Sequence, residues 1–177
     1  MAGQKEEINH PPLIVTLRLQ PEQQQFFNEL RKAHFPAHVN YLDAHITLFH
    51  HLPSGGPFIH EQLLAFARHA PIRLLVNEIR NLGNGVAYSI ESEELLQLHQ
   101  QMQHTFAAWL NTKDQQILWP HITIQNKATA FKAQQLFEKL SENFTPFEIT
   151  ATGINTWLYL KGPWKAVDTL PFMDAHL

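Results

Sequence analysis

The sequence predicts an α+β fold with two lobes related by a pseudo-twofold axis, in which antiparallel sheets line a central cleft and helices lie on the outside. One observation is a repeated tetrapeptide, His-Ile-Thr-Leu at residues 45–48 and His-Ile-Thr-Ile at residues 121–124. Another is the order of elements, since strand, helix, motif strand and helix are followed by hairpin, helix, motif strand, helix and closing strands. We therefore expect a single domain over residues 1–177, made of two intertwined lobes. The motif strands are expected at the centres of the sheets, facing the cleft.

Local patterns support each element of the first half. Residues 13–19 alternate apolar side chains with Thr16 and Arg18, which is typical of a strand. Pro21 suits the first turn of a helix because an N–H there would have no partner, and Pro36 marks the end of that helix. The elements expected next are the motif strand at residues 44–50, a turn at residues 53–57 and a helix at residues 58–69.

The second half is expected to start with a hairpin, because residues 81–85 place Asn and Gly between two β-like runs. Ser92 can cap the next helix, whose first turn holds two glutamates, and Thr129 can cap the last helix. Gly153 can break the long strand near the end. The expected ranges are strands at 72–79, 86–91, 117–126, 147–160 and 164–170, and helices from 93 to 109 and from 130 to 143.

The composition excludes several classes of protein. The 177 residues include no cysteine, which excludes disulfides, thiolate catalysis and cysteine-ligated zinc. The net charge of −3 gives no global positive field, so we expect no long duplex nucleic acid as partner. No apolar run approaches the ~18 residues of a membrane span, and the amino-terminal segment lacks a signal pattern. We expect a cytoplasmic monomer that needs no cofactor and no membrane.

The twelve histidines do not form a metal-binding pattern. No pair has the His-Glu-x-x-His arrangement, which places two ligands on one helical face. His99 and His104 are five positions apart, whereas neighbours on a helix face are three or four apart. We therefore expect no metal site.

Each motif is expected to present a histidine and a threonine on one face of its strand. Residues two apart in a strand share a face, so His45 lies with Thr47 and His121 lies with Thr123. The aliphatic residues of both motifs then point to the core. One such motif alone is typical of a half-exposed surface pair. Two copies favour a single polar site suited to two proton transfers at a phosphate.

The motifs resemble the paired H-x-T/S-x signatures of the 2H phosphoesterase superfamily. The branch they resemble is that of the 2′,5′ RNA ligase-like (LigT-like) proteins, which include RNA 2′,3′-cyclic phosphodiesterases. The resemblance extends to the order of elements over most of the chain and to Pro120 directly before His121. The first motif differs, because Asp43 and Ala44 replace the more usual proline before the histidine.

This resemblance implies a bilobal α+β fold and metal-independent phosphodiester chemistry. Carried over by motif position, it implies that His45 donates a proton and His121 accepts one. Thr47 and Thr123 would bind phosphate oxygens. Histidine suits both proton roles because its ordinary pKa lies near neutrality, and a bell-shaped pH profile follows.

The expected function is hydrolysis of a 2′,3′-cyclic phosphate on a nucleotide or on the 3′ end of an RNA. The same steps run backwards would give 2′,5′ RNA ligase activity. A second interpretation keeps the chemistry and takes 2′,5′-linked oligonucleotides or another small cyclic phosphate as substrate. A third, from another class, is a non-catalytic module that binds nucleotides or RNA ends, although binding alone does not require two titratable groups.

Six further side chains are open candidates for the mouth of the site. Aromatic rings on the strand at residues 154–160 could stack a base, and cations near it could hold a phosphate. An ordinary solvated face explains the same pattern equally well. The six are Arg18, Trp157, Tyr159, Lys161, Trp164 and Lys165.

Overall fold

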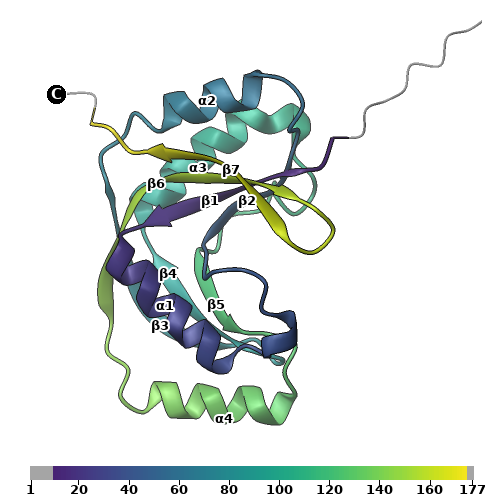
Figure 1. Ribbon diagram of the computed structural model, residues 1–177. Coiled ribbons are helices and arrows are strands. Elements are labelled where there is room, and N and C mark those ends of the chain that lie inside the picture. The colour runs from purple at the N-terminus through teal and green to yellow at the C-terminus, as the bar shows by residue number, and fades with distance from the viewer. Residues whose placement is uncertain (1–9, 175–177) are drawn as a thin grey trace, which may run out of the picture.

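The computed structural model describes residues 10–174 of the chain, and within them strands and helices are mixed along the sequence (Figure 1). The strands are β1 Leu13–Leu19, β2 Thr47–Leu52, β3 Ile72–Asn81, β4 Val86–Glu91, β5 His121–Gln125, β6 Phe147–Tyr159 and β7 Trp164–Pro171. The α-helices are α1 Pro21–His34, α2 Phe58–Phe66, α3 Glu93–Phe106 and α4 Ala130–Ser141, with short 3-10 helices at Ala37–Val39 and Ala107–Trp109. The predicted α+β class is confirmed.

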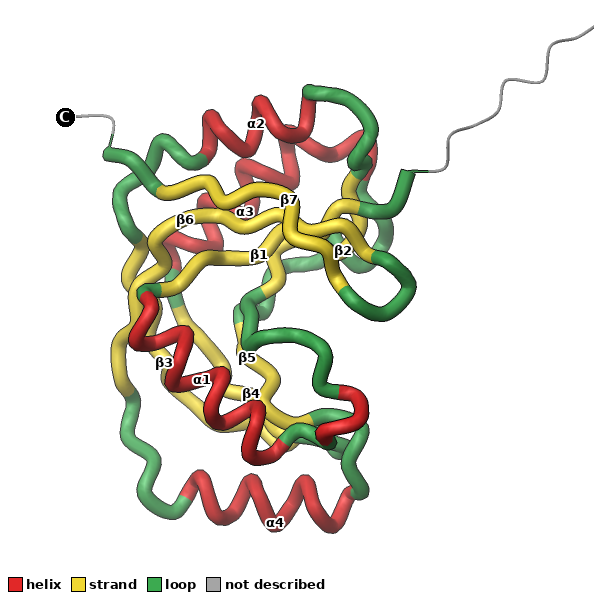
Figure 2. The backbone as a smooth tube through the Cα atoms, in the orientation of Figure 1, coloured by secondary structure: helices red, strands yellow, loops and turns green. Residues whose placement is uncertain are grey.

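The strands form one antiparallel sheet that extends through two lobes. Its order is β2-β1-β6-β3-β4-β5, and β7 pairs with the later part of β6. The first residues of β6 pair with β3, and its later residues pair with β1. One lobe therefore holds β1, β2 and β7, the other holds β3, β4 and β5, and β6 runs through both (Figure 2). The two-lobed, antiparallel arrangement is as the sequence predicts.

The motif strands do not lie at the centre of the sheet, and that expectation was wrong. β2 and β5 occupy the two ends of the strand order, so each has a single neighbour in the described part of the chain. The order of strands is set by long-range pairing, and the local pattern of a motif does not encode it. A strand at the end of a sheet leaves one edge of its backbone open.

The helices cross between the lobes, so the two halves of the sequence are intertwined. α1, from the first half, packs against β5 of the second half. α3, from the second half, packs against β2, where the ring of His99 donates a hydrogen bond from Nε2 to the carbonyl of Leu48 at 2.9 Å. Phe106 of the same helix packs edge-on against Phe49, with ring centroids 5.7 Å apart. Each motif strand is thus supported by a helix from the other half.

Several local predictions are confirmed in detail. Ser92 and Thr129 cap α3 and α4 by accepting hydrogen bonds from the backbone N–H groups three residues later. Gly153 lies where the register of β6 against β1 shifts. A Cβ at this position would come within 2.5 Å of the carbonyl oxygen of Leu170 on β7, so glycine is required by the close approach of the neighbouring strand.

Several boundaries differ from the predictions. The first motif strand was expected to begin at residue 44 and begins at Thr47, so His45 lies just before it. The helix expected at residues 58–69 ends at Phe66. The second motif strand begins at His121 and not at residue 117, because Pro120 has no N–H to contribute to a ladder. The apolar stripe of α3 ends at Phe106, and Trp109 lies in the following 3-10 helix with 42% of its surface exposed.

Candidate active site

The four motif side chains that share the polar faces meet at one cavity. His45, Thr47, His121 and Thr123 are all half-buried and line a cavity of about 290 Å³. The aliphatic residues between them are almost fully buried in the core, as the alternation of side chains in a strand predicts. The edge strand β5 with His121 and Thr123, and the edge strand β2 with Thr47 and the segment just before it with His45, therefore place two imidazoles and two hydroxyls at one cavity.

The two imidazoles are held in the same way. Nδ1 of His45 lies 2.7 Å from the carbonyl oxygen of Asp43, and Nδ1 of His121 lies 2.7 Å from the carbonyl oxygen of Trp119. In both cases the acceptor is the residue two positions earlier. A carbonyl accepts only, so Nδ1 carries a proton and donates it. In a neutral ring the other nitrogen, Nε2, is then the basic atom, and in a protonated ring Nε2–H is the acid that remains free to react.

Each imidazole also packs against a tryptophan. The ring of Trp119 stacks on His121 at a centroid distance of 4.0 Å, and Nε1 of Trp119 donates to Oγ of Ser89. The ring of Trp164 lies 4.7 Å from that of His45 at an angle of 51°. These contacts restrict the rotation of both imidazoles, so the free nitrogens keep fixed directions.

The surroundings of the two histidines oppose their protonation. Burial in the cleft lowers the pKa of His45 to about 4, the hydrogen bond to Asp43 partly opposes this, and positive charge on Arg31 lowers the pKa further. Burial likewise lowers the pKa of His121 below its ordinary value of 6.5, and the hydrogen bond to Trp119 again acts in the opposite direction. In the absence of an anion, both rings are therefore neutral at pH 7.

A second cavity of about 580 Å³ adjoins the first, since His45 lines both. Trp157 and Trp164 line its aromatic wall, and their ring centroids are 6.1 Å apart. Nε1 of Trp157 donates to Oγ1 of Thr16, which fixes the tilt of that ring. Tyr41, which is largely exposed, lies at the same cavity. The cleft thus has a polar part around the motifs and a part with aromatic walls beside it.

The structure divides the six open candidates into two groups. Arg18, Trp157 and Trp164 line the aromatic part of the cleft. Within residues 10–174, the side chains that line either cavity do not include those of Tyr159, Lys161 and Lys165. Lys161 lies in the turn between β6 and β7 with a φ of 60°, so the strand face that it would share with Trp157 ends before it.

Arg31 of α1 ties the segment before the first motif to the second motif strand. Its side chain is 5% exposed, and Nε donates to Oδ1 of Asn40 and to the carbonyl of Leu42. Its Nη1 donates to the carbonyl of Thr123 at 2.9 Å. Burial lowers the pKa of Arg31 to about 10, and the charge of Asp43 partly offsets that effect. Arg31 therefore links the two halves directly behind the four motif side chains.

Several polar residues of the smaller cavity have no counterpart among the predicted site residues. Among them are His50, Lys113 and Asp114. His50 belongs to a run of two histidines in the first motif strand, where alternation from Thr47 places it on the opposite face. Asp114 and Lys113 lie in the segment at residues 111–116, whose pattern indicates only a linker. The pairing of the linker with the strand is a long-range contact, and no local pattern signals it.

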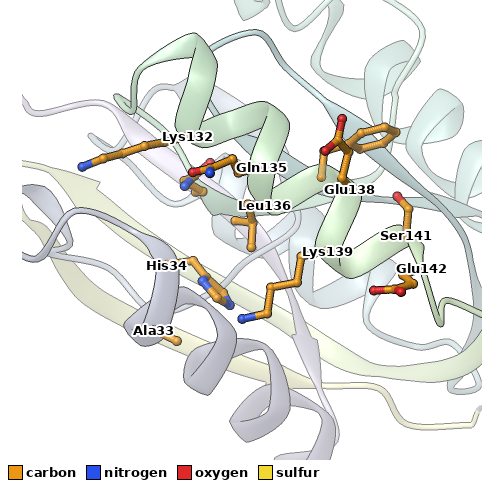
Figure 3. Close-up of a pocket in the computed structure, with 11 residues that line it drawn as sticks. Ala33, His34, Lys132, Gln135, Leu136, Glu138, Lys139, Ser141 and Glu142 are labelled. Atoms are coloured by element: carbon orange, nitrogen blue, oxygen red, sulfur yellow. The ribbon is translucent and has the colours of Figure 1, made fainter.

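A larger hollow lies elsewhere and contains neither motif. It has a volume of about 1060 Å³, lies between α1 and α4, and is lined by side chains such as His34, Lys132 and Lys139 (Figure 3). In Figure 3 these side chains border an open surface groove between the two helices. The chemistry of two imidazoles and two hydroxyls belongs to the smaller cavity.

Within residues 10–174, no three or more His, Asp or Glu side chains gather in a way that could hold a metal ion. Among the same residues, no helix has the length and apolar character to cross a membrane.

Two histidines and two threonines from opposite ends of the sheet line one cavity, which is the arrangement that the 2H phosphoesterase signatures in the sequence imply. The chain belongs to the 2′-5′ RNA ligase superfamily, whose family model matches residues 19–163, and the resemblance noted in the sequence is confirmed. No curated protein sequence matches the chain.

Solved structures of low sequence identity share the fold. The crystal structure of E. coli LigT complexed with 3′-AMP is similar over 94% of this chain and 100% of that chain, with a TM-score of 0.58 and 15% identity. TT0787 of Thermus thermophilus is similar over 93% of this chain and 100% of that chain, with a TM-score of 0.60 and 18% identity. The structure of E. coli LigT complexed with NADP+ gives a TM-score of 0.58 at 16% identity, over 93% and 99% of the two chains.

Proposed function

We propose that this protein is a metal-independent phosphodiesterase that hydrolyses the 2′,3′-cyclic phosphate of a nucleotide or of an RNA 3′ end. The observation that carries the proposal is the matched pair of imidazoles, each with Nδ1 donating to a backbone carbonyl and Nε2 left free at a shared cavity. Membership of a phosphoesterase superfamily supports it independently. The cytoplasmic location expected from the sequence stays a prediction.

In this mechanism His121 accepts a proton from water through Nε2, and the water oxygen forms a bond to phosphorus. The bond between phosphorus and one ribose oxygen breaks at the same centre, and its electron pair stays on that oxygen. His45 gives its Nε2 proton to the leaving oxygen, which becomes a ribose hydroxyl. Thr47 and Thr123 donate hydrogen bonds to the non-bridging oxygens as negative charge grows on them.

His45 must gain a proton before it can act as the acid. Its pKa is lowered to about 4 by burial in the free protein, so it is neutral at pH 7. A bound phosphate anion raises the pKa of a nearby histidine, since opposite charges within about 4–6 Å favour the charged form. Binding of the substrate phosphate and protonation of His45 are therefore coupled. This coupling suits an enzyme whose substrate always carries a negative phosphate.

The aromatic part of the cleft is suited to a nucleoside. Trp157 and Trp164 offer ring faces on which a base can stack, and stacking tolerates any base. Arg18 lies at the same cavity and can contact a neighbouring phosphate. The structures of E. coli LigT with 3′-AMP and with NADP+ support a nucleotide as ligand of this fold.

Ligation uses the same groups. A ribose hydroxyl in place of water would lose its proton to His121 as its oxygen bonds to phosphorus, and His45 would give its proton to the ribose oxygen that leaves, so a new phosphodiester bond replaces the broken one. The superfamily takes its name from 2′-5′ RNA ligase activity, which supports this reaction when two RNA ends are bound.

The test is turnover of 2′,3′-cyclic AMP by the purified protein in excess chelator, with the product identified by chromatography. We expect hydrolysis at a rate that added Mg²⁺ does not change, because the two imidazoles perform both proton transfers. Restoration of a lost activity by a divalent ion would contradict the metal-free mechanism. Faster cleavage of a 2′,5′-linked dinucleotide would instead identify that linkage as the substrate. Tight binding without any product would favour a binding module.

A further inference from the structure

A bulge in β2 turns His50 into the cavity. Thr47 pairs with Thr16 of β1, and Phe49 pairs with Val15, so one step along β1 corresponds to two along β2. Strict alternation from Thr47 would place Phe49 on the cleft side and His50 on the core side. The bulge reverses this, since Phe49 is fully buried whereas His50 lines the cavity with 40% of its side chain exposed. Bulges beside active sites commonly redirect a side chain in this way.

A buried carboxylate holds His50 in this orientation. Asp114 is 3% exposed and accepts hydrogen bonds from the backbone N–H groups of His50 and His51 at 2.9 Å, on the open edge of β2. Its Oδ1 also accepts from Nδ1 of His50 at 3.0 Å. Burial alone would raise the pKa of Asp114, but these hydrogen bonds hold it below its ordinary value, so the carboxylate is charged. His50 therefore presents Nε2 to the cavity, with a negative charge behind the ring.

The loop that carries Asp114 is itself fixed. The backbone N–H of Asp114 donates to Oδ1 of Asn111, and Nε2 of Gln103 on α3 donates to the carbonyls of Asp114 and Gln116, all at 2.8 Å. The next residue back along the chain, Lys113, lines the same cavity with an exposed side chain. These hydrogen bonds thus hold the imidazole of His50 and the ammonium group of Lys113 beside the motif residues.

Lys113 gives the wall formed by these two residues a positive charge, and His50 adds to it when its ring is protonated. Positive charge on His50 and on Lys113 lowers the pKa of His121, after the larger effect of burial, which places both groups near the catalytic pair. Among the described residues that line the cavity, Asp114 is the single carboxylate, and its oxygens are already taken by three N–H donors. A positive wall is unexpected on global grounds, because the chain has a net charge of −3.

We propose that His50 and Lys113 form an anion subsite for a second negatively charged group of the substrate, next to the phosphate that reacts. The motif histidines and threonines already supply four groups to the reacting phosphate, and the cavity of about 290 Å³ approaches the size of a small-ligand site. Asp114 is the positioning residue that holds His50. The substrate class is then a nucleotide with an additional phosphate or comparable anion beyond the cyclic phosphate. This inference rests on the proposed function, because it takes the motif residues as the centre of reaction.

The experiment compares inorganic phosphate with inorganic pyrophosphate by isothermal titration calorimetry at pH 6 in the presence of chelator. Pyrophosphate offers a second anionic group at the shortest distance. We expect the wild-type protein to bind it about tenfold or more tightly than phosphate, the gain typical of one charge-assisted hydrogen bond. His50→Gln and Lys113→Gln should each reduce this ratio several-fold. Lys113→Arg, which keeps the charge, should retain it.

His51→Gln is the matched control, because His51 is the adjacent exposed histidine and its side chain does not line the cavity. Lys113 is exposed, so its variants fold even if His50→Gln does not. An equal loss of phosphate and pyrophosphate affinity would overturn the subsite, since His50 and Lys113 would then act on a single phosphate. A wild-type ratio near one, or an equal effect of His51→Gln, would also overturn it. If the wild-type protein does not turn over 2′,3′-cyclic AMP, only the proposed function is contradicted. The ratio of pyrophosphate to phosphate affinity is measured without catalysis and still tests the subsite.

Discussion

The two motif strands repeat each other at the reacting groups and differ just beyond them. In both, the histidine donates from Nδ1 to the carbonyl two residues earlier, a tryptophan packs on the ring, and the register shifts after the threonine. Five residues after the first histidine stands His50, held by Asp114. Five residues after the second stands Asn126, which is half-buried and does not line the cavity.

The two motif strands share their reacting groups but differ in the surroundings of those groups. The shared features build a symmetric pair of proton-transfer groups with hydroxyls beside them. A hydrolysis is not symmetric, since one group must accept a proton while the other donates. The roles of His45 as acid and His121 as base follow from the motif resemblance, and in the proposed mechanism His45, whose pKa is lowered to about 4, depends on a bound anion to become an acid. The second strand has no counterpart of the His50–Asp114 pair among the described residues, so any second anion has one side on which to bind.

The largest expected effect is removal of either motif histidine. His45→Ala and His121→Ala should each lower kcat/KM for 2′,3′-cyclic AMP by about 10²- to 10⁴-fold, the range for loss of a general acid or base. Both side chains are half-buried and lie on the cavity, so the free energy of unfolding should change by about 1 kcal/mol or less. His51→Ala is the control of the same residue type. A wild-type rate in either motif variant would remove that histidine from the mechanism.

Removal of one threonine hydroxyl should have a smaller effect. Thr47→Ala and Thr123→Ala each take away one donor to a phosphate oxygen, which is worth on the order of 10²-fold in kcat by analogy with a single oxyanion donor. Steady-state kinetics on the same substrate measure the loss, with Thr112→Ala in the exposed linker as control. Unequal losses would show that the two halves hold the phosphate unequally. Unchanged rates in both variants would mean that the hydroxyls are structural.

The link between the halves can be broken at Arg31. Arg31→Met removes the buried donor to Asn40, Leu42 and Thr123 and leaves their acceptors unpaired, at a cost of about 3 kcal/mol in the free energy of unfolding. Chemical denaturation measures this, and Lys32→Met is the exposed neighbouring control. Stability equal to that of the control would show that the connection contributes nothing net.

The smallest effect is a displacement of the pH profile. His121 must be neutral to act as base, and its pKa lies below 6.5, so activity falls on acidification only below that pH. His45 must be protonated to act as acid, and bound phosphate raises its pKa from about 4. The alkaline limb of kcat should therefore lie about 1–3 pH units above that of kcat/KM, which reports the free enzyme. If the alkaline limbs of kcat and kcat/KM coincide at constant ionic strength, substrate binding does not promote protonation of His45, and this part of the mechanism is contradicted.

The motif residues were predictable because their signal is local. A period of two places His45 with Thr47 and His121 with Thr123 whatever the strand order, and repetition of the pattern indicates convergence. His50 escaped prediction because a bulge reverses the alternation after Thr47, and a bulge depends on pairing with β1.

Local sequence patterns also could not predict the strand order or the loop contacts. The motif strands were expected at the centre of the sheet and lie at its ends, because pairing partners are chosen among strands far apart in the sequence. Asp114 belongs to a segment without hydrophobic periodicity, and its carboxylate reaches a strand more than sixty positions earlier. Trp164 was an open candidate, and the turn between β6 and β7 brings it against His45.

The central claim is that the two halves supply one acid and one base that act together, and a double-variant cycle tests it most directly. The kcat/KM of His45→Ala, His121→Ala and the double variant is measured on 2′,3′-cyclic AMP, with folding of each checked by circular dichroism. Groups that act as a unit show non-additive losses, so the double variant should lose little more activity than the poorer single variant. A loss equal to the sum of the two single losses in activation free energy would show that the histidines act independently, and a shared two-proton mechanism would then be wrong.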